Sequence, residues 1–339
     1  MIELLMFSRQ YQVPLVFRAA GTSLSGQAIT DGILVDLSQH WDKIIIEKNG
    51  EQVRVQPGAI GAHVNTYLKK YSKKIGPDPA SINSAMIGGI ISNNSSGMCC
   101  GVSKNSYHTT KYLRFILPNG MTFSTEKESD YMRFKVDCAH IYHKIKLLRY
   151  QLQENKDALA LIRKKYRTKN TVGYSVNAFI DFEHPLDILA HLLIGGEGTL
   201  GFIAEAVMDT VPDYPLKSTA LLYFPDMHAA CKAIIPLIGS GAEAVELMDR
   251  ASLRSIEHIT GMPAIIKQLP EKSAALLVEY QGYNTQEVNA KVSQFDLLAK
   301  ELLLEGATVI GVAGFYRYSS RAGFALESAK GHVSFCRSR

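Results

Sequence analysis

Hydrophobic positions in the first part of the chain recur with two periods, one typical of short strands and one typical of helices. Residues 1–12 have helical spacing that ends before Pro14, and Leu15–Phe17 is a β-prone run that stops at a turn-forming stretch. Residues 76–101, rich in Gly, Ser and Asn, are predicted as a long loop. Further strands are predicted at 33–37, 44–46, 53–55, 112–117 and 203–208, and further helices at 60–68 and 139–166.

The pattern changes around Val211–Pro215, and we place a domain boundary near residue 213. Apart from one short extra helix, the elements beyond it follow a βαββαβ order, which predicts a ferredoxin-like antiparallel sheet covered by helices. The fold class expected for the whole chain is therefore α+β. The strands are predicted at 219–224, 244–247, 274–280 and 307–312, and the helices at 226–239, 250–260 and 285–305.

Composition is that of an ordinary globular protein. The chain has 339 residues, of which 46% are hydrophobic and 20% are charged, and this length suits two domains. Its net charge of +5 is interpreted as spread along the chain rather than gathered in blocks. The densest basic stretch, 163–167, is typical of a solvated helix face, with an anion or nucleic-acid site as the alternative. No nucleic-acid partner is expected.

The cysteines do not indicate a disulfide framework. Their number is odd and no CxxC pair occurs, so a reducing compartment is expected. No apolar run reaches the roughly 18 residues of a membrane span, and no signal peptide is recognised. A cytoplasmic location is predicted, with peripheral membrane contact left open. The five cysteines are Cys99, Cys100, Cys138, Cys231 and Cys336.

Three glycine-rich segments are candidates for binding a phosphate-bearing ligand. The strand at 15–17 runs into Arg18–Gln27, and the other two segments are 85–97 and 195–201. Neither a GxGxxG fingerprint after a strand nor a P-loop occurs, so the common nucleotide-binding motifs are excluded. Each segment alone is open to interpretation as a plain turn or loop. Together they favour a large polar ligand, which would satisfy the polar backbone of a long buried loop.

Several stretches resemble the FAD-binding domain of the p-cresol methylhydroxylase (PCMH) and vanillyl-alcohol oxidase superfamily. Within it, the likeness is greatest to the D-lactate, glycolate and D-2-hydroxyglutarate dehydrogenases. AVELMDRASL (244–253) is similar to the start of an FAD-linked oxidase C-terminal domain. The other stretches are PLVFRAAGTSLSGQAITDGILVDLS (14–38), VRVQPGAIGAHVNTYL (53–68), GPDPASINSAMIGGIISNNSSG (76–97), NTVGYSVNAF (170–179) and LLIGGEGTLGFIAEA (192–206).

The resemblance implies a two-lobed PCMH-type FAD-binding domain at 1–213 and a partial ferredoxin-like C-terminal domain at 214–315. It also assigns cofactor contacts to positions that match the family's motifs. The pyrophosphate would lie against Ala19, Ala20, Gly21, Thr22, Ser23, Gly26 and Gln27. The flavin and its ribityl chain would lie against Pro77, Asp78, Pro79, Gly88, Gly89, Asn93 and Gly97. The adenosine half would lie near Glu197, Gly198, Gly201 and Ile203.

The sequence departs from the family pattern at a few of these positions. Ala19-Ala20 stands where the family often has two glycines, and Met86 stands where it often has threonine. Members that hold FAD covalently use a histidine in the first loop, and Gly21–Gln27 contains none. The resemblance therefore implies non-covalent FAD.

The implied reaction is oxidation of a D-2-hydroxy acid, with D-lactate expected, by hydride transfer to FAD. Electrons would then pass to a quinone, a cytochrome or an attached Fe–S domain. In the resembled family the catalytic groups lie largely in the C-terminal domain, in a Trp-x-x-Arg-x-Gly segment and a later histidine-rich site. Neither occurs in this sequence, so the catalytic residues are unknown and no metal ligands are assigned.

Other polar residues carry weaker signals. His140 and His143 are three apart in a predicted helix, which would suit two metal ligands, but no third ligand follows nearby. Glu246 and Asp249 end a predicted strand. Two interpretations stay open for these residues: a structural role at the end of the strand, or a position near an active-site cleft.

The ends of the sequence prompt the hypothesis of a truncated protein. Residues 316–339 have no family likeness, yet codons for 315–339 read one base displaced can spell a string containing Trp-Lys-Val-Arg-Lys-Gly. This suggests an out-of-frame tail, and the coding DNA would test it. The family's first strand is also expected ahead of Met1. Two alternatives stay open: an oxidase for another alcohol or sugar, and a non-catalytic flavin-binding remnant.

Overall fold

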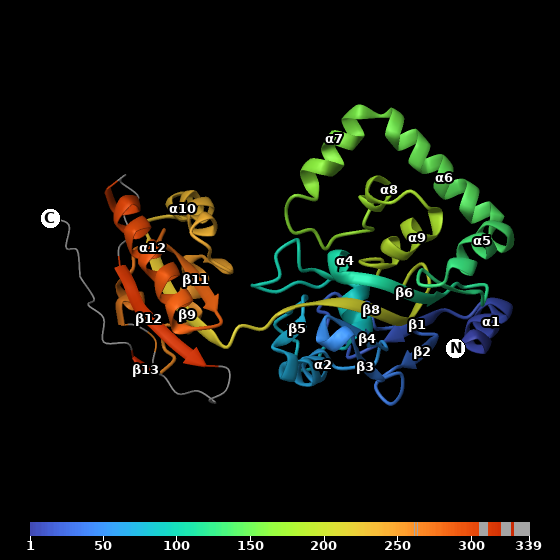
Figure 1. Ribbon diagram of the computed structural model, residues 1–339, viewed down its shortest axis with the longest axis horizontal. Helices are drawn as coiled ribbons and strands as arrows, with labels where there is room; N and C mark the ends of the chain where they lie inside the picture. Colours follow the sequence, from blue (N-terminus) through green and yellow to red (C-terminus); the bar gives the residue numbers. More distant parts are fainter. Residues whose placement is uncertain (261, 263, 305–310, 320–326, 329–339) are drawn as a thin grey trace. The chain divides into compact units, whose positions relative to one another are not determined.

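The computed structural model describes residues 1–260, 262, 264–304, 311–319 and 327–328. The chain divides into two compact units, Met1–Asp213 and Tyr214–Arg339 (Figure 1). Each unit has a hydrophobic core of its own.

The first unit alternates short strands with helices. In order, its elements are α1 (Ile2–Tyr11), β1 (Leu15–Arg18), β2 (Ile33–Asp36), β3 (Ile44–Glu47), β4 (Gln52–Val55), α2 (Gly61–Leu68), β5 (Lys73–Ile75), α3 (Ile87–Ser92), α4 (Ser106–Thr109), β6 (Thr110–Ile116), β7 (Thr122–Ser124), α5 (Glu128–Asp137), α6 (Ala139–Glu154), α7 (Lys156–Lys165), α8 (Ala178–Asp181), α9 (Pro185–Leu193) and β8 (Phe202–Pro212). Two 3₁₀ turns, Lys48–Gly50 and Lys69–Tyr71, lie between them.

β8 is the centre of the main sheet. It pairs antiparallel with β4 and β6, and its far end pairs with β5, so the strand order is β3-β4-β8-β6-β7. Its buried side chains, such as Ile203 and Met208, pack with Val53 of β4 and Phe115 of β6. This arrangement explains why 203–208 has a nearly continuous apolar pattern.

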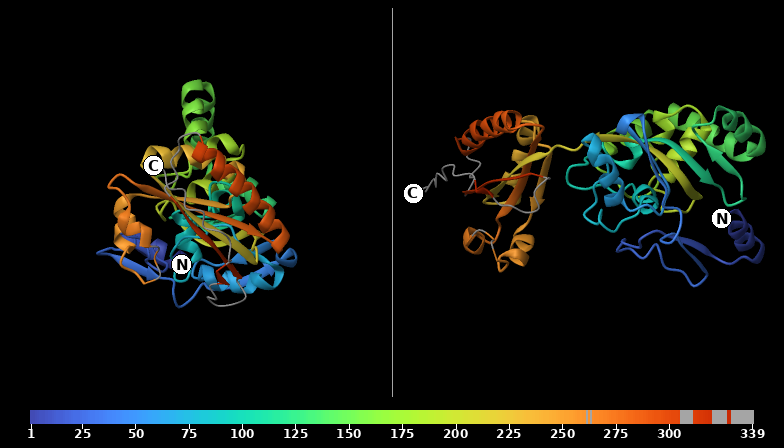
Figure 2. Two further views of the ribbon diagram at one scale, coloured as in Figure 1. Left: turned by 90° about the vertical axis from the view of Figure 1, so that its left-hand side faces the viewer. Right: turned by 60° about the horizontal axis from the view of Figure 1, so that its bottom comes forward.

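A small lobe adjoins this sheet. β1 and β2 form a separate parallel pair, and with α1 they make up a layer of their own (Figure 2, right). Leu5 of α1 and Leu37 after β2 pack against Ile116 and Phe202 of the main sheet. The first unit is therefore two-lobed.

Two regions of the first unit differ from the prediction. The helix predicted over 139–166 is two helices, because the Asn155 side chain accepts a hydrogen bond from Ala158 N–H at 3.0 Å and caps α7. The loop predicted over 76–101 contains the helix α3. Gly88 and Gly89 have low helix propensity, and burial of the isoleucines of α3 outweighs it.

The second unit has the predicted βαββαβ order with one short extra helix. Its antiparallel strands are arranged β10-β11-β9-β12-β13. Part of the strand predicted at 307–312 falls in 305–310, outside the described residues, and the observed strand begins at Gly311. The elements are β9 (Leu216–Phe224), α10 (Met227–Gly239), β10 (Ala244–Met248), α11 (Arg250–Ile256), a 3₁₀ turn (Ala264–Gln268), β11 (Ala274–Gly282), α12 (Thr285–Leu304), β12 (Gly311–Ser319) and β13 (Glu327–Ser328).

The hypothesised out-of-frame tail falls mostly outside the described residues. Its first residues, 316–319, belong to β12 and pair with β9, and 327–328 form β13. A register shift lies between Ala313 and Tyr316. In the described ranges, no helix is both long enough and apolar enough to span a membrane.

A half-buried histidine lies in the helical layer of the first unit. The ring of His191 on α9 stacks on Phe182, with ring centroids 3.8 Å apart, and it also contacts Tyr107. Its Nδ1 lies 2.9 Å from the Asp187 carbonyl oxygen. Burial lowers the pKa of His191 below its usual 6.5.

We expect the free energy of unfolding to fall as the pH drops below about 6.5. The unfolded His191 takes up a proton near that pH, whereas the folded ring stays neutral to a lower pH, so acid favours the unfolded chain. Urea unfolding at a series of pH values measures this. His191→Gln should reduce the pH dependence, and His63→Gln, at an exposed position of α2, should not. If both variants unfold with the same pH dependence, His191 is not its source.

Candidate functional site

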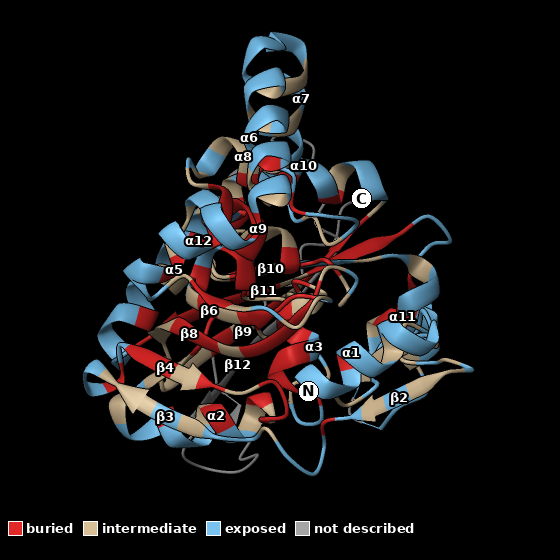
Figure 3. Ribbon diagram, turned by 90° about the vertical axis from the view of Figure 1, so that its right-hand side faces the viewer, coloured by how far each residue is buried: buried red, intermediate tan, exposed pale blue. Residues whose placement is uncertain are grey.

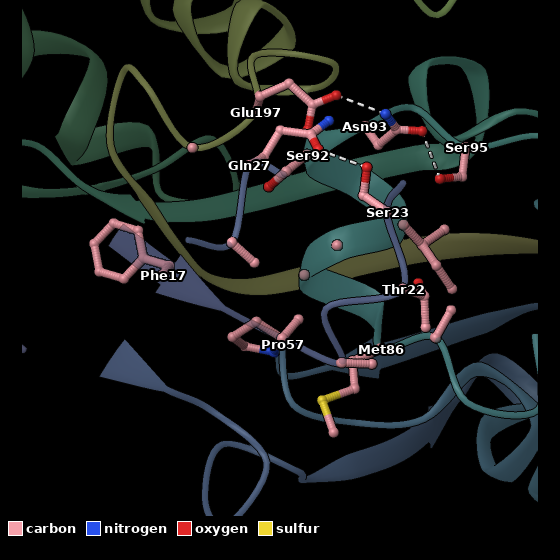
Figure 4. A pocket seen from close by; sticks show the side chains of 18 of the residues that line it. Phe17, Thr22, Ser23, Gln27, Pro57, Met86, Ser92, Asn93, Ser95 and Glu197 are labelled. Carbon is pink, nitrogen blue, oxygen red and sulfur yellow. Dashed lines mark hydrogen bonds between the residues drawn. The ribbon is translucent and has the colours of Figure 1, made fainter. Parts of the chain in front are cut away.

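A cavity of about 360 Å³ lies in the first unit (Figure 4). Three segments that are distant in sequence form most of its wall: the loop after β1, the 79–96 tract with α3, and residues 197–203. Its volume lies within the range of small-molecule and cofactor pockets. The site is therefore built where the small lobe meets the main sheet.

The loop after β1 has backbone donors free for a ligand. Within the described residues, the N–H groups of Ala20, Gly21, Thr22 and Ser23 donate no hydrogen bond. The Ser23 hydroxyl donates to Gln27 Oε1 at 2.5 Å, which closes the loop. Successive free N–H groups form the kind of concave surface that binds phosphate oxygens.

α3 presents an open face to the cavity. Its Ile87, Ile90 and Ile91 side chains are buried in the core, whereas Gly89 is exposed. A Cβ at Gly89 would meet only the Ala19 Cβ, at 3.6 Å, and would project into open space. A Cβ at Gly88 would lie 2.6 Å from the Pro57 Cβ, so that position is closed by packing.

Residues 195–197 are bound to the end of α3. Gly195 N–H donates to the Ile91 carbonyl at 3.0 Å, and Glu197 N–H donates to the Ser92 carbonyl at 2.8 Å. Glu197 adopts the left-handed conformation, with φ of 52°, and its Oε1 accepts from Asn93 Nδ2 at 2.6 Å. Figure 4 shows this contact on the cavity wall. These bonds bring two glycine-rich segments into one site.

Most residues that the sequence assigns to cofactor binding line this cavity. Gly26, Pro77, Asp78 and Gly97 do not. The residues that line it are Ala19, Ala20, Gly21, Thr22, Ser23, Gln27, Pro79, Gly88, Gly89, Asn93, Glu197, Gly198, Gly201 and Ile203.

Gly97 and Asp78 pack against each other, and each is next in sequence to a residue that lines the cavity. A Cβ at Gly97 would lie 1.7 Å from the Asp78 carbonyl oxygen, so only glycine permits this close approach. Asp78 Oδ2 accepts from Cys99 N–H at 3.2 Å, and burial raises the pKa of the Asp78 carboxyl. Their position indicates a role in holding the tract in place.

The sequence assignment omits several lining residues. Among all residues that line the cavity, Lys169 is the one lysine or arginine, and its Nζ donates to the Ser96 carbonyl at 3.3 Å. Lys169 directly precedes the 170–179 stretch. The likeness of that stretch to the family was the one sequence signal that could have placed Lys169 at the site. Met86, noted as a departure from the family pattern, also lines the cavity, as do Phe17 and Pro57.

The weaker polar candidates are not brought into this cavity. Asp249 caps α11, because its Oδ1 accepts from Ser252 N–H at 2.7 Å, whereas Glu246 is exposed on β10. His140 and His143 are exposed on α6. Across the described ranges, no three His, Cys, Asp or Glu side chains gather as a metal site would require.

Two family models match the chain, one in each unit. The model of the FAD binding domain matches residues 1–126, and the model of the C-terminal domain of FAD linked oxidases matches residues 215–314. The chain therefore carries both domains of FAD-linked oxidases.

The relatives of this chain include two named enzymes. The D-2-hydroxyglutarate dehydrogenase of Pantoea ananatis is 29% identical over 293 residues, which cover 82% of this chain and 28% of that protein. The glycolate oxidase subunit GlcD of Bacillus subtilis is 26% identical over 286 residues, covering 83% of this chain and 49% of that protein. The chain thus spans less than a third of the first relative and about half of the second.

A solved structure supports the fold. An alkyldihydroxyacetonephosphate synthase superposes with a TM-score of 0.55 at 16% identity, covering 92% of this chain and 50% of that chain. At this identity the likeness concerns the fold alone.

The cavity fits FAD, the cofactor of the matched FAD binding domain. The free N–H groups after β1 suit an anionic pyrophosphate, and the exposed Gly89 leaves room for a large group against α3. Lys169 adds a positive charge at the wall. The dinucleotide would therefore find donors, open volume and charge on these three parts of the cavity.

Replacing Gly89 and Gly88 by alanine should separate cofactor binding from folding. Gly89→Ala should leave the FAD-free chain as stable or more stable, because alanine is about 1 kcal/mol better than glycine within a helix. It should weaken FAD binding by about tenfold by filling space at the wall. Gly88→Ala should lower the free energy of unfolding by about 1–3 kcal/mol through overpacking against Pro57. Flavin fluorescence titration and urea unfolding measure both effects. Unchanged FAD affinity in Gly89→Ala would place the cofactor away from α3.

Lys169→Gln should weaken FAD binding by up to about fivefold, the range for a solvent-accessible charge pair. The difference from the native chain should shrink as salt is added, because the lost interaction is screened. Titration at low and high ionic strength measures it. Lys43→Gln, which removes an exposed charge that does not line the cavity, is the control. An equal effect of both substitutions would exclude a local role for Lys169.

Proposed function

We propose that the protein to which this chain belongs oxidises a D-2-hydroxy acid with non-covalently bound FAD. The observation that carries the proposal is the convergence of three glycine-rich segments on one cavity with free backbone donors. Residues 1–213 would serve as the PCMH-type FAD-binding domain, and residues 214–315 as the domain that takes part in substrate binding. The names of the D-2-hydroxyglutarate dehydrogenase and glycolate oxidase relatives support the substrate class.

Different segments of the cavity wall would bind different parts of the cofactor. Ala19–Ser23 and Gln27 would bind the pyrophosphate through backbone N–H groups. Pro79, Gly88, Gly89 and Asn93 would line the flavin and ribityl chain, and the segment at 197–203 would contact the adenosine half. No histidine occurs in Gly21–Gln27, which supports attachment without a covalent bond.

Bound FAD would supply the two-electron acceptor for hydride from C2 of the substrate. The protein must also hold the substrate carboxylate with a cation and remove the hydroxyl proton with a base. We assign neither group within the described residues. A quinone, a cytochrome or an Fe–S domain would receive the electrons.

The exact acid is a separate proposal. The sequence resemblance implies D-lactate, whereas the D-2-hydroxyglutarate dehydrogenase relative supports D-2-hydroxyglutarate as a second candidate. D-2-hydroxyglutarate carries a second carboxylate on a longer side chain than the methyl group of D-lactate, so selectivity for it needs a second cationic contact.

The visible spectrum of the purified chain tests cofactor binding. We expect a flavin band at about 450 nm, released into the supernatant when the protein is denatured. A band that stays with the denatured protein would contradict non-covalent binding. Absence of a band after incubation with FAD would contradict FAD binding by this chain.

Anaerobic addition of D-lactate or D-2-hydroxyglutarate tests the reaction. A D-2-hydroxy acid should bleach the band, with L-lactate and glucose as controls. The faster of the two D-acids identifies the preferred substrate. Bleaching by an alcohol or sugar alone would favour the other kind of oxidase. A stable band with every compound would favour a flavin-binding role without turnover for this chain.

A further inference from the structure

Positive charge is concentrated in the helical hairpin of α6 and α7 with the residues after it, here called the basic hairpin (139–169). The basic hairpin contains nine Lys and Arg residues and two Asp and Glu residues, a net charge of +7. The whole chain contains 37 Lys and Arg residues and 32 Asp and Glu residues. The rest of the chain therefore carries 28 Lys and Arg against 30 Asp and Glu, a net charge of −2. The expectation that charge is evenly spread is thus wrong.

Most cations of the basic hairpin are exposed, whereas Arg149 is half-buried and donates to the Phe182 carbonyl. α6 buries Ile145 alone, and α7 buries no side chain. Figure 1 shows the two helices extending away from the sheet of the first unit, and Figure 3 shows them mostly in the colour of exposed residues. Lys144, Lys146 and the run 163–165 are exposed and form no ion pair within the described ranges.

Large apolar side chains lie among these cations. Leu147, Tyr150 and Leu161 are 54%, 64% and 66% exposed. Helical geometry places Leu147 and Tyr150 on the side of α6 turned away from the buried Ile145. Exposed apolar side chains flanked by lysines are typical of helices that lie at a membrane interface.

The pattern fits an anionic lipid surface better than other partners. A symmetric contact between two copies would bring two +7 segments together, which charge repulsion opposes. A nucleic acid would pair with the cations but would leave the exposed leucines in water. A bilayer with anionic headgroups satisfies both features, because the apolar side chains reach the acyl boundary while cations meet phosphates.

We propose that the basic hairpin docks the protein on an anionic membrane surface. Arg163, Lys164 and Lys165 contact lipid headgroups, and Leu147, Tyr150 and Leu161 enter the interface. The proposal goes beyond the proposed oxidation and does not depend on FAD, so each can fail without the other.

Vesicle flotation of the full chain tests the proposal. We expect binding to vesicles of phosphatidylcholine mixed with phosphatidylserine, little binding to phosphatidylcholine alone, and release by salt. The triple variant Arg163→Gln, Lys164→Gln, Lys165→Gln should bind about a hundredfold more weakly. Circular dichroism checks that it is folded. No binding of the native chain to anionic vesicles would overturn the proposal.

A matched control removes the same charge elsewhere. Lys43, Lys232 and Lys267 are exposed and lie outside the basic hairpin, so their combined change to Gln should preserve most of the binding. Equal losses in the two triple variants would mean that net charge, and not the basic hairpin, drives association.

The apolar residues distinguish a membrane from other polyanions. Leu147→Ser with Leu161→Ser should weaken vesicle binding severalfold and leave retention on heparin unchanged. Unchanged vesicle binding in this double variant would show that the leucines do not enter the membrane interface. The basic hairpin would then be a general site for polyanions, and the proposal of membrane docking would be overturned.

Discussion

The cavity depends on the hydrogen bonds that join residues 195–197 to the end of α3, because these bonds hold two of its glycine-rich segments together. The last carbonyls of a short helix need donors, and Gly195 and Glu197 supply them to Ile91 and Ser92. The same contacts set the Glu197 carboxylate against Asn93. The hydrogen bonds that satisfy the carbonyl groups at the end of α3 therefore also place residues 195–197 beside the cavity.

Packing decides at which glycines an added side chain would enter the cavity. Gly88 and Gly97 are pressed against other backbone or ring atoms and have no room for a side chain, whereas Gly89 opens onto the cavity. Residues that look equivalent in sequence thus divide into two classes. One class permits the fold, and the other leaves space for FAD.

The first unit also combines surfaces of different character. Its cavity presents backbone donors with a single lysine, while the basic hairpin presents exposed cations and leucines. Both lie in the unit that contains the FAD binding domain. Cofactor binding and attachment to a charged surface can therefore be altered by separate substitutions.

The sequence by itself determined the fold class and the βαββαβ order of the second unit, because hydrophobic period and loop composition are local properties. It also indicated FAD as the cofactor, through the resemblance of its motifs to a known family. Tertiary structure decided what depends on distant contacts. α3 forms despite two glycines because its isoleucines are buried, and Asn155 divides a continuous helical pattern by capping α7. Lys169 reaches the cavity wall only because chain segments far apart in sequence meet there, and no local pattern encodes that meeting.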